Sequence, residues 1–156
     1  IKILRPFNTF GPRQSSRAII PTIILQAINN KTIKLGNLNP TRDFLFVEDT
    51  ANAFIHLMNS KSLLGEVVNV GSGSEISIKK LAFDIKKILN SKSKITIEKK
   101  RVRSKSSEVL RLKCNNHLIK KYTNWKLSTK FKVGLIKTID WFKKNNNKDL
   151  SKIYNI

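Results

Sequence analysis

The sequence predicts an α/β fold, because segments with the pattern of buried strands alternate with segments that carry a helical stripe of apolar residues. The strand segments are short and continuously apolar, as at residues 1–5 and 66–70, which is typical of parallel sheets. The helical segments repeat apolar residues three and four positions apart. With 156 residues, 40% of them hydrophobic, the chain is long enough for one domain with its own core.

The first half of the chain is expected to contain a strand, a helix, two strands, a helix and a strand, over residues 1–5, 17–30, 31–35, 42–47, 48–60 and 66–70. The first strand ends in a polar loop over residues 6–16, and loops at strand ends are where binding sites are built. Ser16 is placed to cap the helix that follows, and Pro21 is tolerated in its first turn.

The second half is expected to add a helix over residues 78–89, a strand over 95–97, a basic loop over 99–107, a short helix before Trp125 and a last helix after Ser128. Ser77 is a good N-cap for the first of these helices. Residues 71–73 (GSG) lack the third glycine of a dinucleotide-binding loop, so we interpret them as a turn that closes a strand.

The charge is strongly uneven. The 31 Lys and Arg residues exceed the 10 Asp and Glu residues by 21, and most of the excess follows residue 78. A basic surface attracts nucleic acid, so a basic nucleic-acid-binding module is one functional alternative. However, 24 of the 31 basic residues are lysine, and readers of nucleic acid favour arginine and exposed aromatic rings. We therefore expect no nucleic-acid partner.

Two classes of protein are excluded at this point. No run of about 18 apolar residues occurs, so we expect no membrane span. Cys114 is the only cysteine, which excludes an internal disulfide and a multi-cysteine metal site and fits a cytoplasmic location. We assign no metal ligand.

Four motifs in register carry a family resemblance. They are residues 4–14 (LRPFNTFGPRQ), 41–44 (TRDF), 47–51 (VEDTA) and 65–71 (GEVVNVG). Together they resemble the extended short-chain dehydrogenase/reductases, the family of NAD-dependent nucleotide-sugar epimerases and 4,6-dehydratases. Residues 11–21 (GPRQSSRAIIP) and 107–112 (SEVLRL) are most similar to dehydratases of UDP-N-acetylhexosamines on legionaminic-acid-type pathways.

The resemblance covers only the C-terminal half of such an enzyme. It implies that residues 1–156 are the substrate-binding part, with the remaining parallel strands of a Rossmann-type sheet and a small α/β domain, and that residues 145–156 are a disordered tail. In the family, the N-terminal half supplies the Gly-rich loop that binds NAD and a catalytic Tyr-x-x-x-Lys dyad. Tyr122 and Lys126 have the dyad's spacing but lead into a turn before the last helix, so we name no catalytic residue and expect the isolated chain to be inactive.

Two arginines are candidates for binding the substrate's diphosphate. Forked guanidinium donors suit two adjacent phosphates better than lysine does. By resemblance, Arg42 in the Arg-Asp-Phe motif contacts the diphosphate from one side and Arg103 from the other. The alternative for Arg42 is an ion pair with Asp43 or Glu48.

Glu108 is a candidate acceptor for the ribose hydroxyls. Its alternative is an ion pair with Arg111 or Lys105. Both interpretations remain open from the sequence.

Four more residues are substrate candidates by resemblance. Asn8 follows the first strand and binds either a sugar or its own turn. Asn69 is equally well explained as closing a strand-end turn. Arg17 contacts the sugar or simply faces solvent, and Leu35 flanks the base or belongs to the core.

The resemblance also implies a cofactor contact and a partner. Pro6 and Phe7 pass near the nicotinamide of NAD, mostly through backbone atoms. The substrate is a UDP-sugar, the reaction is that of a lyase, and the full-length enzyme is expected to be a homodimer. The alternative on the same scaffold is a nucleotide-sugar 4-epimerase.

Overall fold

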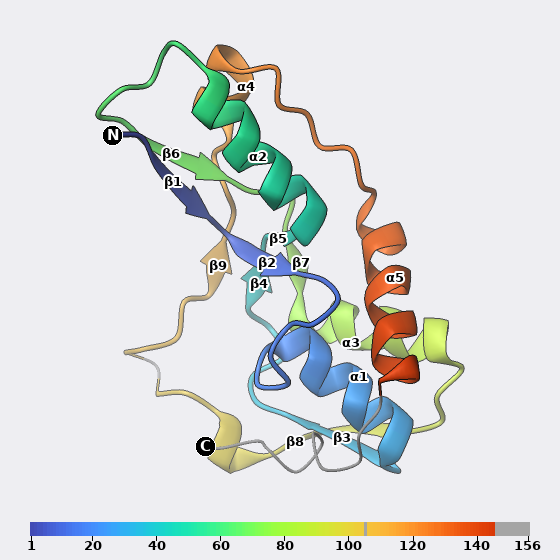
Figure 1. Cartoon of the computed structure of the whole chain (residues 1–156). Coiled ribbons are helices and arrows are strands. Elements are labelled where there is room, and N and C mark those ends of the chain that lie inside the picture. The colour runs from blue at the N-terminus through green and yellow to red at the C-terminus, as the bar shows by residue number, and fades with distance from the viewer. Residues whose placement is uncertain (105, 146–156) are drawn as a thin grey trace.

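The computed structural model describes residues 1–104 and 106–145, and it confirms a mixed α/β chain with parallel strands. Figure 1 shows the elements in chain order: β1 (Ile3–Pro6), β2 (Asn8–Phe10), α1 (Ile19–Asn29), β3 (Thr32–Leu35), β4 (Thr41–Arg42), β5 (Phe44–Phe46), α2 (Val47–Asn59), β6 (Val67–Val70), β7 (Ile76–Ser77), α3 (Ile78–Leu89), β8 (Lys94–Ile97), the 3-10 turn η1 (Lys99–Arg101), β9 (Arg111–Leu112), α4 (His117–Tyr122) and α5 (Phe131–Lys144).

The strands form four small sheets. β1 pairs with β6, β2 with β5, and β3 with β8, each pair parallel. β4 lies between β7, which is antiparallel to it, and β9, which is parallel to it. Parallel pairs need long crossover connections, so each pair joins segments that are distant in sequence.

The core has two parts, which meet at β5, where Phe44 and Phe46 belong to one cluster and Leu45 to the other. α1, α3 and α5 bury one cluster, which includes Ile24, Leu81 and Ile139, at the end where β3 and β8 lie (Figure 1). Leu57 of α2 and Val68 of β6 belong to the second cluster, at the end where α2 lies beside β1 and β6 (Figure 1).

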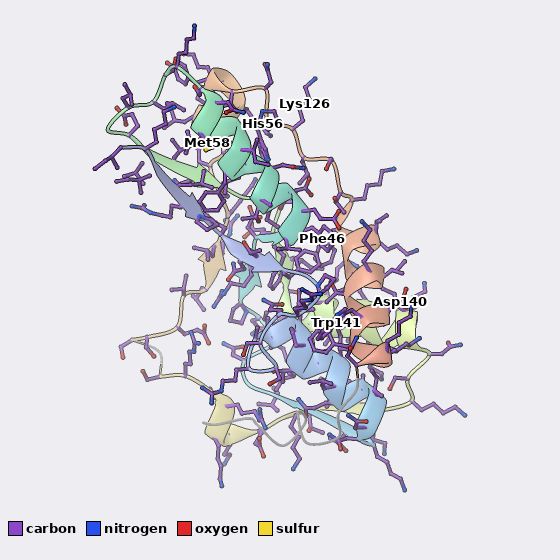
Figure 2. The ribbon with its side chains drawn as sticks, viewed as in Figure 1. Phe46, His56, Met58, Lys126, Asp140 and Trp141 are labelled. Atoms are coloured by element: carbon purple, nitrogen blue, oxygen red, sulfur yellow. The ribbon has the colours of Figure 1, made fainter. Side chains whose placement is uncertain are left out.

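α5 packs closely against the parallel pair of β2 and β5. A Cβ atom at Gly134 would lie 2.7 Å from the ring of Phe46, so glycine allows the helix to approach. Figure 2 labels Phe46 near the base of α2, on the side of α5. In the described part of the chain, no helix is both long and apolar enough to cross a membrane. The tail predicted over residues 145–156 lies outside that part except for Asn145.

Some predicted boundaries are wrong. The first helix begins at Ile19 rather than residue 17, Ala18 is its N-cap, and Ser16 instead accepts a bond from the Thr22 hydroxyl through its carbonyl (2.9 Å). The single strand expected over residues 42–47 is two strands separated by Asp43. Ser77 caps α3 as predicted, with its Oγ accepting from the Lys80 amide (3.2 Å).

A buried carboxylate in α2 holds the segment that precedes α5. Asp49 is 1% exposed and accepts from the amides of Ser128 (3.0 Å) and Thr129 (3.2 Å) and from the Ser128 hydroxyl. Its own carbonyl accepts from the indole N–H of Trp125 (3.0 Å). The segment between α4 and α5 is therefore fixed to the first half of the chain.

We expect Asp49→Asn to lower the free energy of unfolding by about 3 kcal/mol, because the carboxamide removes the charge and directs an NH2 group at donors. Urea unfolding of the whole chain measures this. Asp140→Asn is the control, since Asp140 is exposed on α5 (Figure 2), and it should change stability by less than about 0.5 kcal/mol. Equal stability of the two variants would contradict the role given to Asp49.

Candidate functional site

A cleft of about 440 Å³ lies where β2, the turn before β4 and the segment after η1 meet. Its polar and charged lining comes from three stretches that are distant in sequence: Asn8, Thr9, Gln14 and Arg17; Asn37 and Arg42; Arg101, Arg103 and Glu108. Four of these side chains are arginine and one is glutamate. The cleft therefore carries an excess of positive charge and attracts anions.

Arg42 is held in the cleft by three contacts. Its Nη1 donates to the carbonyls of Thr41 (2.8 Å) and Val109 (2.6 Å), and its Nη2 donates to Glu108 Oε1 (3.1 Å). The two charged side chains are only 16% and 11% exposed. The guanidinium thus has a fixed position and direction, set by two backbone carbonyls and by Glu108.

Arg42 and Glu108 form an ion pair with each other, so Asp43 and Glu48 are wrong as partners of Arg42, and Arg111 is wrong as the partner of Glu108. The Asp43 carboxylate accepts from three backbone amides and one hydroxyl and not from Arg42, and Glu48 pairs with Lys137 (3.0 Å). Arg111 pairs with Glu75 instead of Glu108, and Lys105 lies outside the described residues. The pairing between positions 42 and 108 brings the two predicted ligand contacts together.

Asp43 fixes the backbone next to Arg42. Its carboxylate is fully buried and accepts from the Ser72 amide (2.8 Å) and hydroxyl (2.7 Å), the Gly73 amide (2.9 Å) and the Cys114 amide (3.0 Å). These bonds join β5, the turn after β6 and the segment after β9. Because Arg42 and Asp43 are adjacent, this junction sets where the Arg42 side chain begins.

The remaining candidates divide between the cleft and other places. Asn8 lines the cleft and its Nδ2 donates to the Asp43 carbonyl (3.0 Å), so it binds neighbouring backbone, while Arg17 and Arg103 line the cleft as exposed side chains. Leu35 is 2% exposed and belongs to the core. Asn69 does not line the cleft, and its Oδ1 is buried without a hydrogen-bond partner among the described residues.

Pro6 and Phe7 lie together at the carboxyl end of β1. Pro6 is exposed and Phe7 is half-buried, with its amide donating to the Val70 carbonyl (2.9 Å). The carboxyl ends of parallel strands are where such sheets bind ligands, so the two residues lie at an edge of this kind. The sequence has no Gly-x-Gly-x-x-Gly turn, so these two residues could hold only an edge of a dinucleotide.

Tyr122 and Lys126 do not lie on one helix. α4 ends at Tyr122, and Thr123 is extended (φ −136°, ψ 166°), so the two side chains do not share a helix face. Burial and the nearby Asp43 charge raise the pKa of the Cys114 thiol to about 12, which keeps it protonated and unreactive. Among residues 1–104 and 106–145, no group of three His, Cys, Asp or Glu side chains could hold a metal.

Sequence reasoning did not identify Gln14 and Arg101 as lining residues. Gln14 Nε2 donates to the Thr9 carbonyl (2.8 Å), and Arg101 pairs with Glu98. Gly36 was the signal in the sequence for the side of the cleft that Arg101 forms, because a Cβ atom at this position would lie 2.2 Å from the Arg101 carbonyl oxygen. The glycine lets η1 pack against the turn after β3 and complete the cleft.

Glu75 connects the three strands beside the cleft. Its carboxylate accepts from Arg111 Nε of β9 (3.2 Å) and from the Thr41 hydroxyl of β4 (2.6 Å). The hydrogen bond from Arg111, followed by that from Thr41, lowers the pKa of Glu75 to about 2, against a smaller opposing effect of desolvation.

Comparison with known proteins gives consistent matches. The model of the family described as GDP-mannose 4,6 dehydratase matches residues 1–138. A putative UDP-glucose 4-epimerase of Methanocaldococcus jannaschii is 33% identical over 92% of this chain and 46% of its own length. A UDP-N-acetyl-α-D-glucosaminuronate decarboxylase of Bacillus cytotoxicus is 31% identical over 94% of this chain and 47% of its own.

A solved structure shows the same fold. The dTDP-glucose 4,6-dehydratase of Bacillus anthracis, in complex with NAD, superposes with a TM-score of 0.83 at 27% identity, over 94% of this chain and 46% of that one. The chain therefore spans less than half the length of these proteins.

We expect the pKa of Glu75 to rise toward its ordinary value of 4.5 in Arg111→Gln, since the largest cause of the shift is removed. NMR titration of the Glu75 carboxyl carbon measures this. The folded-state pKa is lowered, so the stabilisation by this pair is complete above pH 4.5 and is lost as the pH falls toward about 2. Lys113→Gln, which removes a charge but no hydrogen bond, should shift the pKa much less. Titration near 4.5 in the unchanged chain would contradict the contact.

Proposed function

The chain belongs to the GDP-mannose 4,6 dehydratase family, within the extended short-chain dehydrogenase/reductases, and on that premise we propose that it is the substrate-binding part of an NAD-dependent nucleotide-sugar 4,6-dehydratase. Its cleft holds the diphosphate and ribose of a UDP-sugar. The Gly-rich loop and the catalytic dyad belong to sequence outside these 156 residues, and the isolated chain is inactive.

The observation that carries the proposal is the convergence of distant candidates on one cleft. Asn8, Arg42 and Glu108 come from separate segments, yet they line the same cavity. Arg103 and Arg17 line it too. Guanidinium groups suit a diphosphate because they donate charge-assisted hydrogen bonds to phosphate oxygens. Arg17 and Arg103 are exposed in the cleft, and Arg42 has N–H donors beyond its three contacts.

Glu108 gives the cleft a second property. Its Oε1 accepts from Arg42, and a carboxylate has acceptor capacity for further donors. A nucleotide supplies both partners at once, phosphate oxygens for Arg42 and ribose hydroxyls for Glu108. A simple phosphate supplies only the first, so the pair favours nucleotides over inorganic anions.

The work of this chain in the reaction is orientation and charge neutralisation. When bound, NAD supplies a hydride acceptor for C4 of the sugar and a hydride donor for C6, with water lost across C5 and C6 in between. Arg42 and Arg103 fix the diphosphate, so the sugar beyond it meets the cofactor in one geometry. Pro6 and Phe7, at the end of β1, would border the nicotinamide of bound NAD. Leu35 belongs to the core and offers no surface to the base, and Asn69 stays a proposed contact outside this cleft.

A nucleotide-sugar 4-epimerase is the second candidate, favoured by the similarity to the putative UDP-glucose 4-epimerase of M. jannaschii. It would use the same diphosphate contacts, because the residues that separate the two reactions lie beside the catalytic tyrosine. The homodimer of the whole enzyme and its cytoplasmic location also stay predictions.

Binding by the chain itself tests the cleft. We expect UDP-N-acetylglucosamine to bind in calorimetry, and Arg42→Lys and Arg103→Gln each to weaken its affinity about tenfold or more through lost charge-assisted hydrogen bonds. Arg103 is exposed, so its variant does not endanger folding. Arg13→Lys is the matched control, because Arg13 is exposed in the same loop as Arg17 but does not line the cleft. Tighter binding of duplex RNA or inorganic diphosphate than of the UDP-sugar would reject the proposal.

The product distinguishes the two reactions. In a protein that joins this chain to a cofactor-binding half, a UDP-sugar deuterated at C4 should lose water and carry deuterium at C6. Mass spectrometry and NMR of the product measure both. An isomer of unchanged mass, inverted at C4, would identify the epimerase instead.

A further inference from the structure

A groove separates α3 from α5 on a part of the surface that shares no lining residue with the cleft. The two helices pack against each other (Figure 1), and the hollow between them has a volume of about 540 Å³. It is lined by Lys80, Asp84, Lys87, Ile88, Phe131, Lys132, Leu135 and Ile136. This volume lies within the range of roughly 300–1,000 Å³ that is usual for ligand sites.

The floor of the groove is apolar. Leu135 is 1% exposed at its base, and Ile88 and Phe131 are half-buried beside it. Ile136 remains 38% exposed at the edge. Burial of such apolar surface by a partner lowers the free energy of the complex.

The rim of the groove is positively charged. Lys80 pairs with Asp84 in the next turn of α3 (3.0 Å). In the part of the chain that the structure describes, Lys87 and Lys132 have no carboxylate within 4.0 Å. One cation therefore stands on each side of the apolar floor, on α3 and on α5.

We propose that this groove docks an amphipathic helix of another protein, with an apolar stripe flanked by acidic residues. A trough between two helices matches the helix-in-groove mode of recognition, in which residues at i, i+3, i+4 and i+7 enter the apolar floor. Carboxylates on both flanks of such a helix meet Lys87 and Lys132, and this complementarity sets the orientation. A second copy of the chain is a poor occupant, because each copy carries a net charge of +21.

A synthetic probe tests the groove. The peptide is a fluorescent helix of about 18 residues, or five turns, with leucine at the four stripe positions and glutamate on both flanks. Ile136→Asp and Lys132→Glu should each weaken its binding about tenfold or more in fluorescence anisotropy. Val133→Asp and Lys144→Glu are the matched controls, because both side chains are exposed on α5 and neither lines the groove; they should change the affinity less than about twofold.

Neither groove variant is expected to disrupt the fold. Ile136 is already partly exposed, and an acidic residue at position 132 suits the first turn of a helix, so amide NMR spectra should show both variants folded. In the unchanged chain the peptide should shift signals of α3 and α5 and leave the cleft unaffected, whereas a peptide with lysine flanks should not bind.

Three results would overturn the proposal. One is equal binding of the peptide by groove and control variants. Another is tighter binding of phosphatidylserine vesicles than of the peptide, with loss on Lys132→Glu, which would assign the face to a membrane surface. The last is concentration-dependent dimerisation that Ile136→Asp abolishes.

Discussion

A fully buried carboxylate at Asp43 determines how the two halves of this chain meet. Removing a charge from water is costly unless hydrogen bonds replace its solvation, and here three backbone amides and one hydroxyl supply them. The donors come from Ser72 and Gly73 after β6 and from Cys114 after β9, so a single side chain joins three strands' ends. Asp49 has the same role toward the segment before α5. The position of Arg42 in the cleft follows from the first of these two junctions.

The sequence was informative where a feature repeats or forms a motif. Apolar periodicity predicted α3 and α5, and Ser77 marked the start of α3. The boundary at Asp43 was missed because a long-range hydrogen-bond network, and not local pattern, breaks that strand. Ser16 had the chemistry of a cap, but the helix begins three residues later, at Ile19, with Ala18 at the N-cap position. The motifs pointed to Asn8, Arg42 and Glu108, whereas Gln14, although it lies in the first motif, and Arg101 were not singled out, because a loop has no period that shows which polar side chains face a cleft. The pairing of residues 42 and 108 joins positions 66 apart, which no local pattern can predict.

The structure separates two uses of positive charge that the composition combines. The chain has seven arginines, of which four line the cleft, while none of the lysines in the described residues does so. Lysine occurs instead on the exterior, in loops and strands as well as on helices, where a flexible ammonium group stays hydrated. The high net charge is thus mainly a property of the exterior, and the directional donors are concentrated in one place.

The contact between Arg42 and Glu108 separates how fast an anion arrives from how well it is recognised. Long-range attraction arises from the whole basic exterior and is screened beyond about 8 Å at physiological ionic strength. At the pair itself, the two opposite charges lie 3.1 Å apart, so an arriving molecule meets a local dipole with a donor end and an acceptor end. The free energy of binding to such a dipole depends more on how the ligand's donors and acceptors are arranged than on its total charge. Ionic strength should therefore alter the association rate strongly and the discrimination between chemically different ligands only weakly.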